Sequence, residues 1–94
     1  MKMEDYIAEH AVLVEVDRYR PYGSKEVWNS LYFKHRTLPL EWSVYRTTTN
    51  RITGRIKRLD KKDEMEMTLS TETIKALLKL VWPNYTLKGN ETID

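Results

Sequence analysis

The chain has 94 residues and a net charge of +2, and its 40% hydrophobic and 32% charged residues are typical of one soluble globular domain. It has no cysteine, which excludes disulfides, thiolate metal sites and cysteine nucleophiles. Its first residues lack the order of a signal peptide, and no apolar run approaches the roughly 20 residues that cross a bilayer. We therefore expect a single domain over residues 1–94 with no membrane partner. A cytoplasmic location is expected because small secreted domains usually depend on disulfides.

The charge is distributed unevenly along the chain. Residues 1–17 carry one lysine against five acidic residues, a net charge of −4. Residues 18–62 carry twelve basic against three acidic residues, a net charge of +9, and residues 63–94 carry three against six, a net charge of −3. A basic middle segment between two acidic ends is the strongest functional signal in the sequence.

The first twenty residues predict a short acidic element and then a strand. Residues 1–10 form an acidic N-terminal arm or a short helix. Over residues 11–20, Val12, Val14 and Val16 recur with a period of two, which indicates a strand. Pro21 and Gly23 predict the turn that ends it.

Residues 24–36 fit either a helix or a strand. Ser24 suits a helix N-cap, with an apolar stripe to follow. A strand would place Val27, Asn29, Leu31 and Phe33 on one face and Trp28 and Tyr32 on the other. The aromatic and β-branched content favours a strand over residues 26–35.

Residues 42–69 predict a three-stranded antiparallel meander with strands 42–48, 52–59 and 64–69. A three-residue loop at 49–51, in which Asn50 adopts left-handed geometry, pairs Val44 with Ile56 and Tyr45 with Arg55. A four-residue loop at 60–63 pairs Ile56 with Met67 and Gly54 with Leu69. The inner face collects Val44, Ile52, Ile56, Met65, Met67 and Leu69. The outer face collects Tyr45, Thr47, Thr53, Arg55, Lys57, Glu64, Glu66 and Thr68.

A helix is predicted over residues 71–82, capped by Ser70 and ended by Pro83. Its apolar stripe contains Ile74, Leu77, Leu78 and Val81. The tail over residues 84–94 is polar and expected to be frayed. The fold class is therefore α+β, a small antiparallel sheet of four to five strands with the helix packed on it. Gly54 indicates a bulge or a large neighbour that covers the strand.

No motif for a metal or cofactor is present. His10 and His35 stand twenty-five positions apart, without a known ligand spacing, and no glycine-rich phosphate loop occurs. We expect no cofactor and, more generally, no catalysis. One enzymatic alternative stays open, a metal-independent ribonuclease that uses His35, Glu41, Tyr45 and Arg46.

The basic middle segment predicts a nucleic-acid-binding protein, for DNA or RNA, that contacts phosphates through the outer sheet face. The residues expected at this surface are Tyr45, for stacking on a base, and Arg46, Arg51, Arg55, Lys57, Arg58, Lys61 and Lys62. Alternation turns Arg46 and Arg58 toward the inner face, so they are weaker candidates for phosphate contact. Cross-strand pairing of Lys57 with Glu66, and of Arg55 with Glu64 or Glu66, would instead make this an ordinary solvated face.

The second function predicted is a small interaction protein that binds and inhibits or regulates a protein partner, or forms a homodimer. Trp28, Leu80 and Trp82 are the interface candidates, because aromatic anchors are common at interfaces. The competing explanation is that the tryptophans form the core. Small basic proteins without cysteine are common in phages and mobile elements, so a virus-encoded protein is expected. The partner, the oligomeric state and the source organism stay open.

Overall fold

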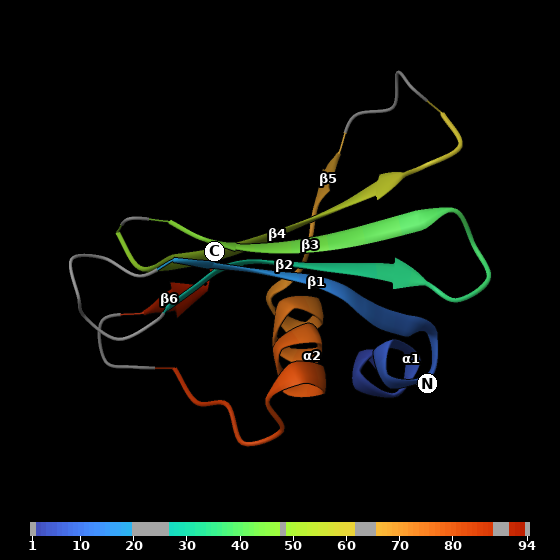
Figure 1. Cartoon of the computed structure of the whole chain (residues 1–94). Helices are drawn as coiled ribbons and strands as arrows, with labels where there is room; N and C mark the ends of the chain where they lie inside the picture. The colour runs from blue at the N-terminus through green and yellow to red at the C-terminus, as the bar shows by residue number, and fades with distance from the viewer. Residues whose placement is uncertain (1, 20–26, 48, 62–65, 88–90, 94) are drawn as a thin grey trace.

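The computed structural model describes residues 2–19, 27–47, 49–61, 66–87 and 91–93. In these ranges the chain forms two helices and six strands (Figure 1). In chain order they are α1 (Met3–His10), β1 (Ala11–Tyr19), β2 (Val27–His35), β3 (Leu40–Arg46), β4 (Arg51–Arg58), β5 (Met67–Thr68), α2 (Thr71–Val81) and β6 (Thr92–Ile93).

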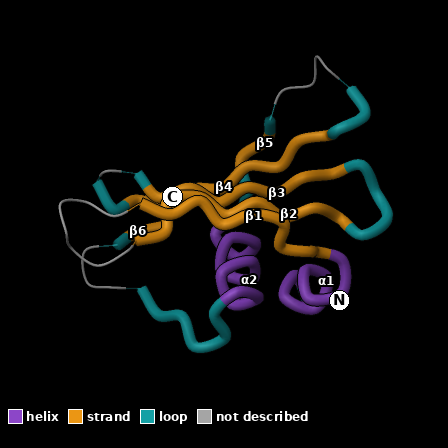
Figure 2. The backbone as a smooth tube through the Cα atoms, viewed as in Figure 1, coloured by secondary structure: helices purple, strands orange, loops and turns teal. Residues whose placement is uncertain are grey.

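The strands form one sheet in the order β1-β2-β3-β4-β5, with each neighbouring pair antiparallel. β6 pairs in parallel with the start of β4. Both helices lie under the same face of this sheet, and its other face carries no helix (Figures 1 and 2). The predicted α+β fold, an antiparallel meander with a C-terminal helix packed on it, is confirmed. Neither helix is long and apolar enough to cross a membrane.

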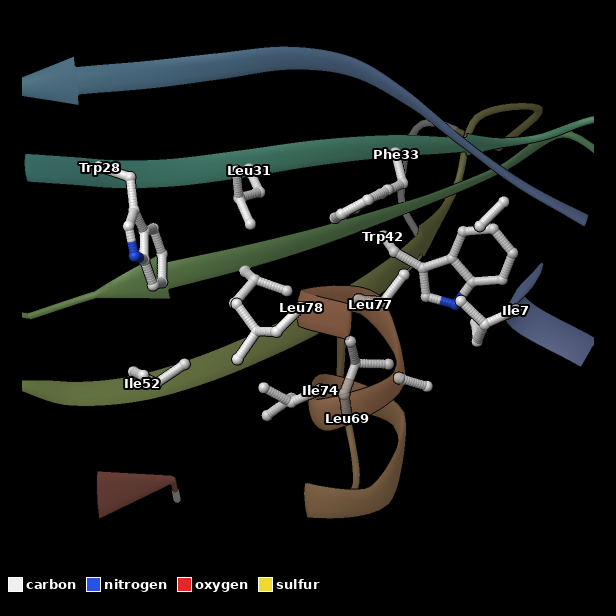
Figure 3. Close-up of a cluster of buried hydrophobic side chains, with 13 residues drawn as sticks. Ile7, Trp28, Leu31, Phe33, Trp42, Ile52, Leu69, Ile74, Leu77 and Leu78 are labelled. Carbon is white, nitrogen blue, oxygen red and sulfur yellow. The ribbon is translucent and has the colours of Figure 1, made fainter. Parts of the chain in front are cut away.

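The core lies between the sheet and α2, where α2 presents its apolar stripe (Figure 3). The Ser70 hydroxyl accepts a hydrogen bond from the Thr73 N–H at 3.2 Å and so caps the helix. Ile74, Leu77 and Leu78 are then fully buried against the strands. The helix ends at Val81, one residue before the predicted end, because Trp82 takes an extended backbone.

β2 is a strand, as the aromatic content favoured, but its predicted faces are wrong at one end. Ser30 lies opposite Asp17 while Trp28 lies opposite Arg18, so β2 has one extra residue at Asn29. This β-bulge turns Trp28 to the same face as Leu31, and the indole joins the core. A bulge changes the alternation locally, which a strict period of two does not foresee.

The β3–β4 hairpin has the predicted faces but a different register. Val44 lies opposite Gly54, not Ile56, and the Thr47 N–H donates to the Arg51 carbonyl at 2.8 Å. The loop therefore begins one residue earlier than predicted, and the pairing shifts by two. A shift of two keeps every side chain on its face. Asn50 does adopt the left-handed conformation, with φ of 61°.

The β4–β5 pairing matches the prediction. Ile56 lies opposite Met67, and the Leu69 N–H donates to the Gly54 carbonyl at 2.9 Å. β5 is shorter than predicted, and Glu64 and Met65 lie outside the described residues. Met67 was expected in the core, but it is 70% exposed because it lies on the outermost strand.

Gly54 is covered by large neighbours, as expected. A Cβ atom at this position would lie 2.8 Å from Leu69 Cδ1, 3.0 Å from Ile74 Cγ1 and 3.2 Å from the Ser43 carbonyl oxygen. The glycine therefore lets the start of α2 pack directly on β4.

The C-terminal tail is not frayed throughout. Tyr85 stacks on Trp82 with ring centroids 5.9 Å apart, and Glu91 is 5% exposed. β6 then pairs with β4, and the Thr92 N–H donates to the Asn50 carbonyl at 3.1 Å. This part of the tail is bound to the sheet.

Candidate functional site

Arg46, Trp28 and Trp82 form a cluster that holds the tail to the sheet. An Arg46 guanidinium nitrogen lies 3.3 Å from a Glu91 carboxylate oxygen, and its Cζ lies 4.5 Å from the centroid of the Trp28 ring. The Arg46 side chain is 13% exposed and that of Glu91 is 2% exposed. This position turns Arg46 away from any phosphate that approaches the other face of the sheet.

Two predicted interface residues belong to the same cluster. The rings of Trp28 and Trp82 lie 5.9 Å apart, with Trp28 buried and Trp82 half-buried. The Tyr85 hydroxyl donates to the Glu91 carboxylate at 3.3 Å. Burial, together with the charge of Glu91, raises the pKa of Tyr85. The tryptophans therefore serve the fold, while Leu80 lies at the surface of α2 with 36% of its area exposed.

Three of the remaining predicted cations, Arg55, Lys57 and Arg58, have carboxylate partners. The charged nitrogens of Arg55 and Lys57 lie 3.8 Å from Glu66 and 3.5 Å from Glu41, respectively. The structure thus pairs Lys57 with Glu41 of β3, while Glu66 pairs with Arg55. Each of these two exposed pairs contributes only about 0–1 kcal/mol.

The last three described cations, Arg51, Arg58 and Lys61, lie around the ends of β4. Arg58 makes two hydrogen bonds to Asp60, at 3.0 and 2.8 Å, and the hydrogen bond lowers the pKa of Asp60. Arg51 and Lys61 are exposed, and Lys62 lies outside the described residues. The basic middle segment of the sequence is therefore interleaved with carboxylates in space.

The open face is the sheet face without helices. Strand register and alternation assign to it Val12, Glu15, Asp17, Ser30, Tyr32, Lys34, Glu41, Ser43, Tyr45, Thr53, Arg55, Lys57 and Thr68. It carries the three cations Lys34, Arg55 and Lys57 and the three carboxylates Glu15, Asp17 and Glu41, and Glu66 beside Arg55 adds a fourth carboxylate. Among the described residues the open face thus has no excess of positive charge.

Two tyrosines occupy the middle of the open face. Tyr32 and Tyr45 meet edge to face, with centroids 6.2 Å apart at 83°. Tyr32 lies opposite Ser43 and Tyr45 opposite Ser30, and both serines are buried. The rings therefore shield the small serines and form a local aromatic patch. Tyr45 was predicted as a surface residue, whereas Tyr32 was missed because the order of the strands was unknown.

β1 has a free edge, since it is the last strand in the order and pairs only with β2 among the described elements. Three consecutive apolar residues are exposed here: Val12 by 36%, Leu13 by 37% and Val14 by 49%. Leu13 lies opposite Phe33 and Glu15 opposite Tyr32, so Val14 is the extra residue of a second bulge. The valines of β1 predicted a strand here, but no pattern in the sequence indicates its place at the edge of the sheet.

The residues considered for ribonuclease chemistry do not converge. By alternation His35 and Arg46 face the helices, whereas Glu41 and Tyr45 belong to the open face. His35 Nδ1 accepts the N–H groups of Thr37 and Leu38, at 3.1 and 3.0 Å. That imidazole is occupied by structural hydrogen bonds. No group of three or more metal-ligating side chains occurs in the described parts of the chain.

No family model, curated protein or solved structure matches this chain. The candidate binding surfaces are the two open surfaces of the sheet, the face with Tyr32 and Tyr45 and the free edge of β1.

Proposed function

We propose that this protein is a non-catalytic interaction module that binds, and thereby inhibits or regulates, a protein partner through the free edge of β1. The observation that carries the proposal is the exposed apolar run Val12–Val14 on a nine-residue edge strand. Unpaired N–H and C=O groups on such an edge can hydrogen-bond an extended segment of another chain as an added strand. In that mode the main chain supplies affinity and the alternate side chains supply specificity.

The charge arrangement supports a protein partner over a polyanion. Nucleic-acid affinity grows with the number of phosphates that free cations neutralise. Here Arg46, Arg55, Lys57 and Arg58 each lie beside a carboxylate, and Arg46 is also largely buried. An approaching phosphate would have to displace those partners.

The proposal is tested by selecting random twelve-residue displayed peptides on the wild-type protein and then measuring their affinity for Val14→Lys. A lysine on the edge is a common way to block strand addition, so we expect selected peptides to lose about tenfold or more in affinity. Hydrogen exchange should slow at β1 amides when a peptide binds.

Leu38→Lys is the matched control, because Leu38 is 50% exposed and lies outside the strands. It should leave affinity unchanged. Peptides that bind Val14→Lys as well as wild type, or a selection without enrichment, would contradict the proposal.

Binding of single-stranded nucleic acid to the open face is the second candidate, favoured by Tyr32 and Tyr45 beside Lys34. Stacking of a base on an aromatic ring contributes roughly 1–3 kcal/mol. Oligonucleotide affinity at two salt concentrations is the measurement. If this candidate holds, affinity should fall with salt by a log–log slope of about −0.7 per contacted phosphate. Replacement of both tyrosines by alanine should abolish it, and absence of binding at low salt excludes it.

A further inference from the structure

We infer, on the basis of the proposed function, that the segment bound by the edge of β1 is basic, with apolar residues between its lysines or arginines. The strand that carries Val12–Val14 continues into Glu15 and Asp17, both exposed. An added strand would therefore meet an apolar stretch and then two carboxylates.

These two carboxylates differ from four others in the described chain. Glu41, Glu66, Asp60 and Glu91 each lie within ion-pair distance of a lysine or arginine. Neither Glu15 nor Asp17 has an ion pair or a side-chain hydrogen bond with another described residue. Their charges are therefore available to a partner, and pairing them at an interface costs no existing contact.

The spacing of the two acids matches strand addition. Glu15 lies opposite Tyr32 and Asp17 opposite Ser30, so both project from the open face. Alternate residues of an added strand project on that same side and come directly beside them. Lysine or arginine at two alternate positions of the partner would then face Glu15 and Asp17.

A second copy of the chain is the less favourable occupant of this edge. A two-fold axis would bring β1 beside β1 of the other copy, together with its own acids. Residues 1–17, which comprise α1 and most of β1, have a net charge of −4 in each copy. Like charges that face each other across an interface disfavour association, whereas a basic segment is attracted.

The test uses three synthetic nine-residue peptides in which valine alternates with lysine, glutamine or glutamate. We expect the lysine peptide to bind about tenfold more tightly than the glutamate peptide at low salt, with the glutamine peptide between them. The difference should shrink at high salt, where the Debye length falls to about 3 Å. Slowed hydrogen exchange at β1 amides identifies the site.

Charge reversal at the edge provides the decisive comparison. The double variant Glu15→Lys/Asp17→Lys should invert the order, so that the glutamate peptide binds more tightly than the lysine peptide. Glu66→Lys/Glu72→Lys changes the net charge equally, near the opposite edge of the sheet, and should keep the wild-type order.

The outcomes separate this inference from the proposed function. If all three peptides bind wild type equally and Val14→Lys abolishes their binding, the inference of a basic segment is wrong but strand addition at β1 still holds. Peptide binding that Val14→Lys does not change, or no binding at all, would overturn both. If sedimentation shows that the wild type is a dimer and that Val14→Lys is not, a second copy of the chain occupies the edge. The inference of a basic partner is then wrong.

Discussion

Glu91 shows how one residue near the end of the chain secures its tail. Its carboxylate lies beside Arg46 and accepts the Tyr85 hydroxyl. Trp28 Nε1 and Arg46 Nε are buried and have no hydrogen-bond partner among the described residues. Glu91 thus supplies the negative charge in a cluster whose other polar groups are hydrogen-bond donors, and not all of these donors have an acceptor.

Glu91→Gln should lower the free energy of unfolding by about 2–3 kcal/mol, because it leaves the Arg46 guanidinium largely buried without a counter-charge. Urea denaturation provides the measurement. Glu66→Gln is the control, since it removes an exposed pair and should cost less than about 1 kcal/mol. Equal losses in the two variants would show that the Arg46–Glu91 pair does not stabilise the tail.

At the scale of elements, α1 is attached to the sheet through a stack of rings. His10 of α1 stacks on His35 of β2 at 4.8 Å and 13°, and His35 stacks on Trp42 at 5.6 Å. Tyr6 Oη lies 3.0 Å from His35 Nε2. Because His35 Nδ1 accepts two backbone N–H groups, the imidazole is neutral with its proton on Nε2.

This attachment should make stability depend on pH. Burial, with a smaller contribution from nearby His10, lowers the pKa of His35 below its usual 6.5. In acid the unfolded chain therefore binds a proton that the folded chain does not. The free energy of unfolding should fall as the pH drops below about 6.5 toward the folded pKa of His35. Above about pH 6.5 the contribution of His35 to stability is complete.

His35→Asn tests this dependence, because the asparagine side-chain oxygen can replace Nδ1 as the acceptor for Thr37 and Leu38. Urea midpoints at pH 7.5 and 5.5 should differ more for wild type than for the variant. Identical differences would show that His35 does not cause the pH dependence, because the variant lacks only this imidazole.

At the scale of the whole molecule, the two helices cover one face of the sheet, and in the described part of the chain the other face and the edge of β1 stay open (Figure 2). Cations and carboxylates alternate across β2, β3 and β4, as in the row Lys34, Glu41 and Lys57. Glu15 and Asp17 of β1 have no ion-pair partner among the described residues. Four cations of the middle segment, Arg46, Arg55, Lys57 and Arg58, thus lie beside carboxylates, which supports the proposed protein partner over a polyanion.

Local patterns in the sequence determined the elements and most of their faces. The period of two in β4, the Ser70 cap and the need for left-handed geometry at Asn50 depend on neighbours only a few residues away. In β1 the same period predicted the strand, but the bulge at Val14 places Val12 and Val16 on opposite faces. Even the error of two in the β3–β4 register kept the faces correct, because side chains alternate with that period.

Only the tertiary structure decided which surfaces stay open. The bulges at Val14 and Asn29, the Lys57–Glu41 pair and the burial of Arg46 beside Glu91 arise between residues on different strands or distant in the chain. The place of β1 at the sheet edge likewise depends on the order of all strands. No local periodicity contains that order, because pairing is selected by the packing of the complete sheet on its helices.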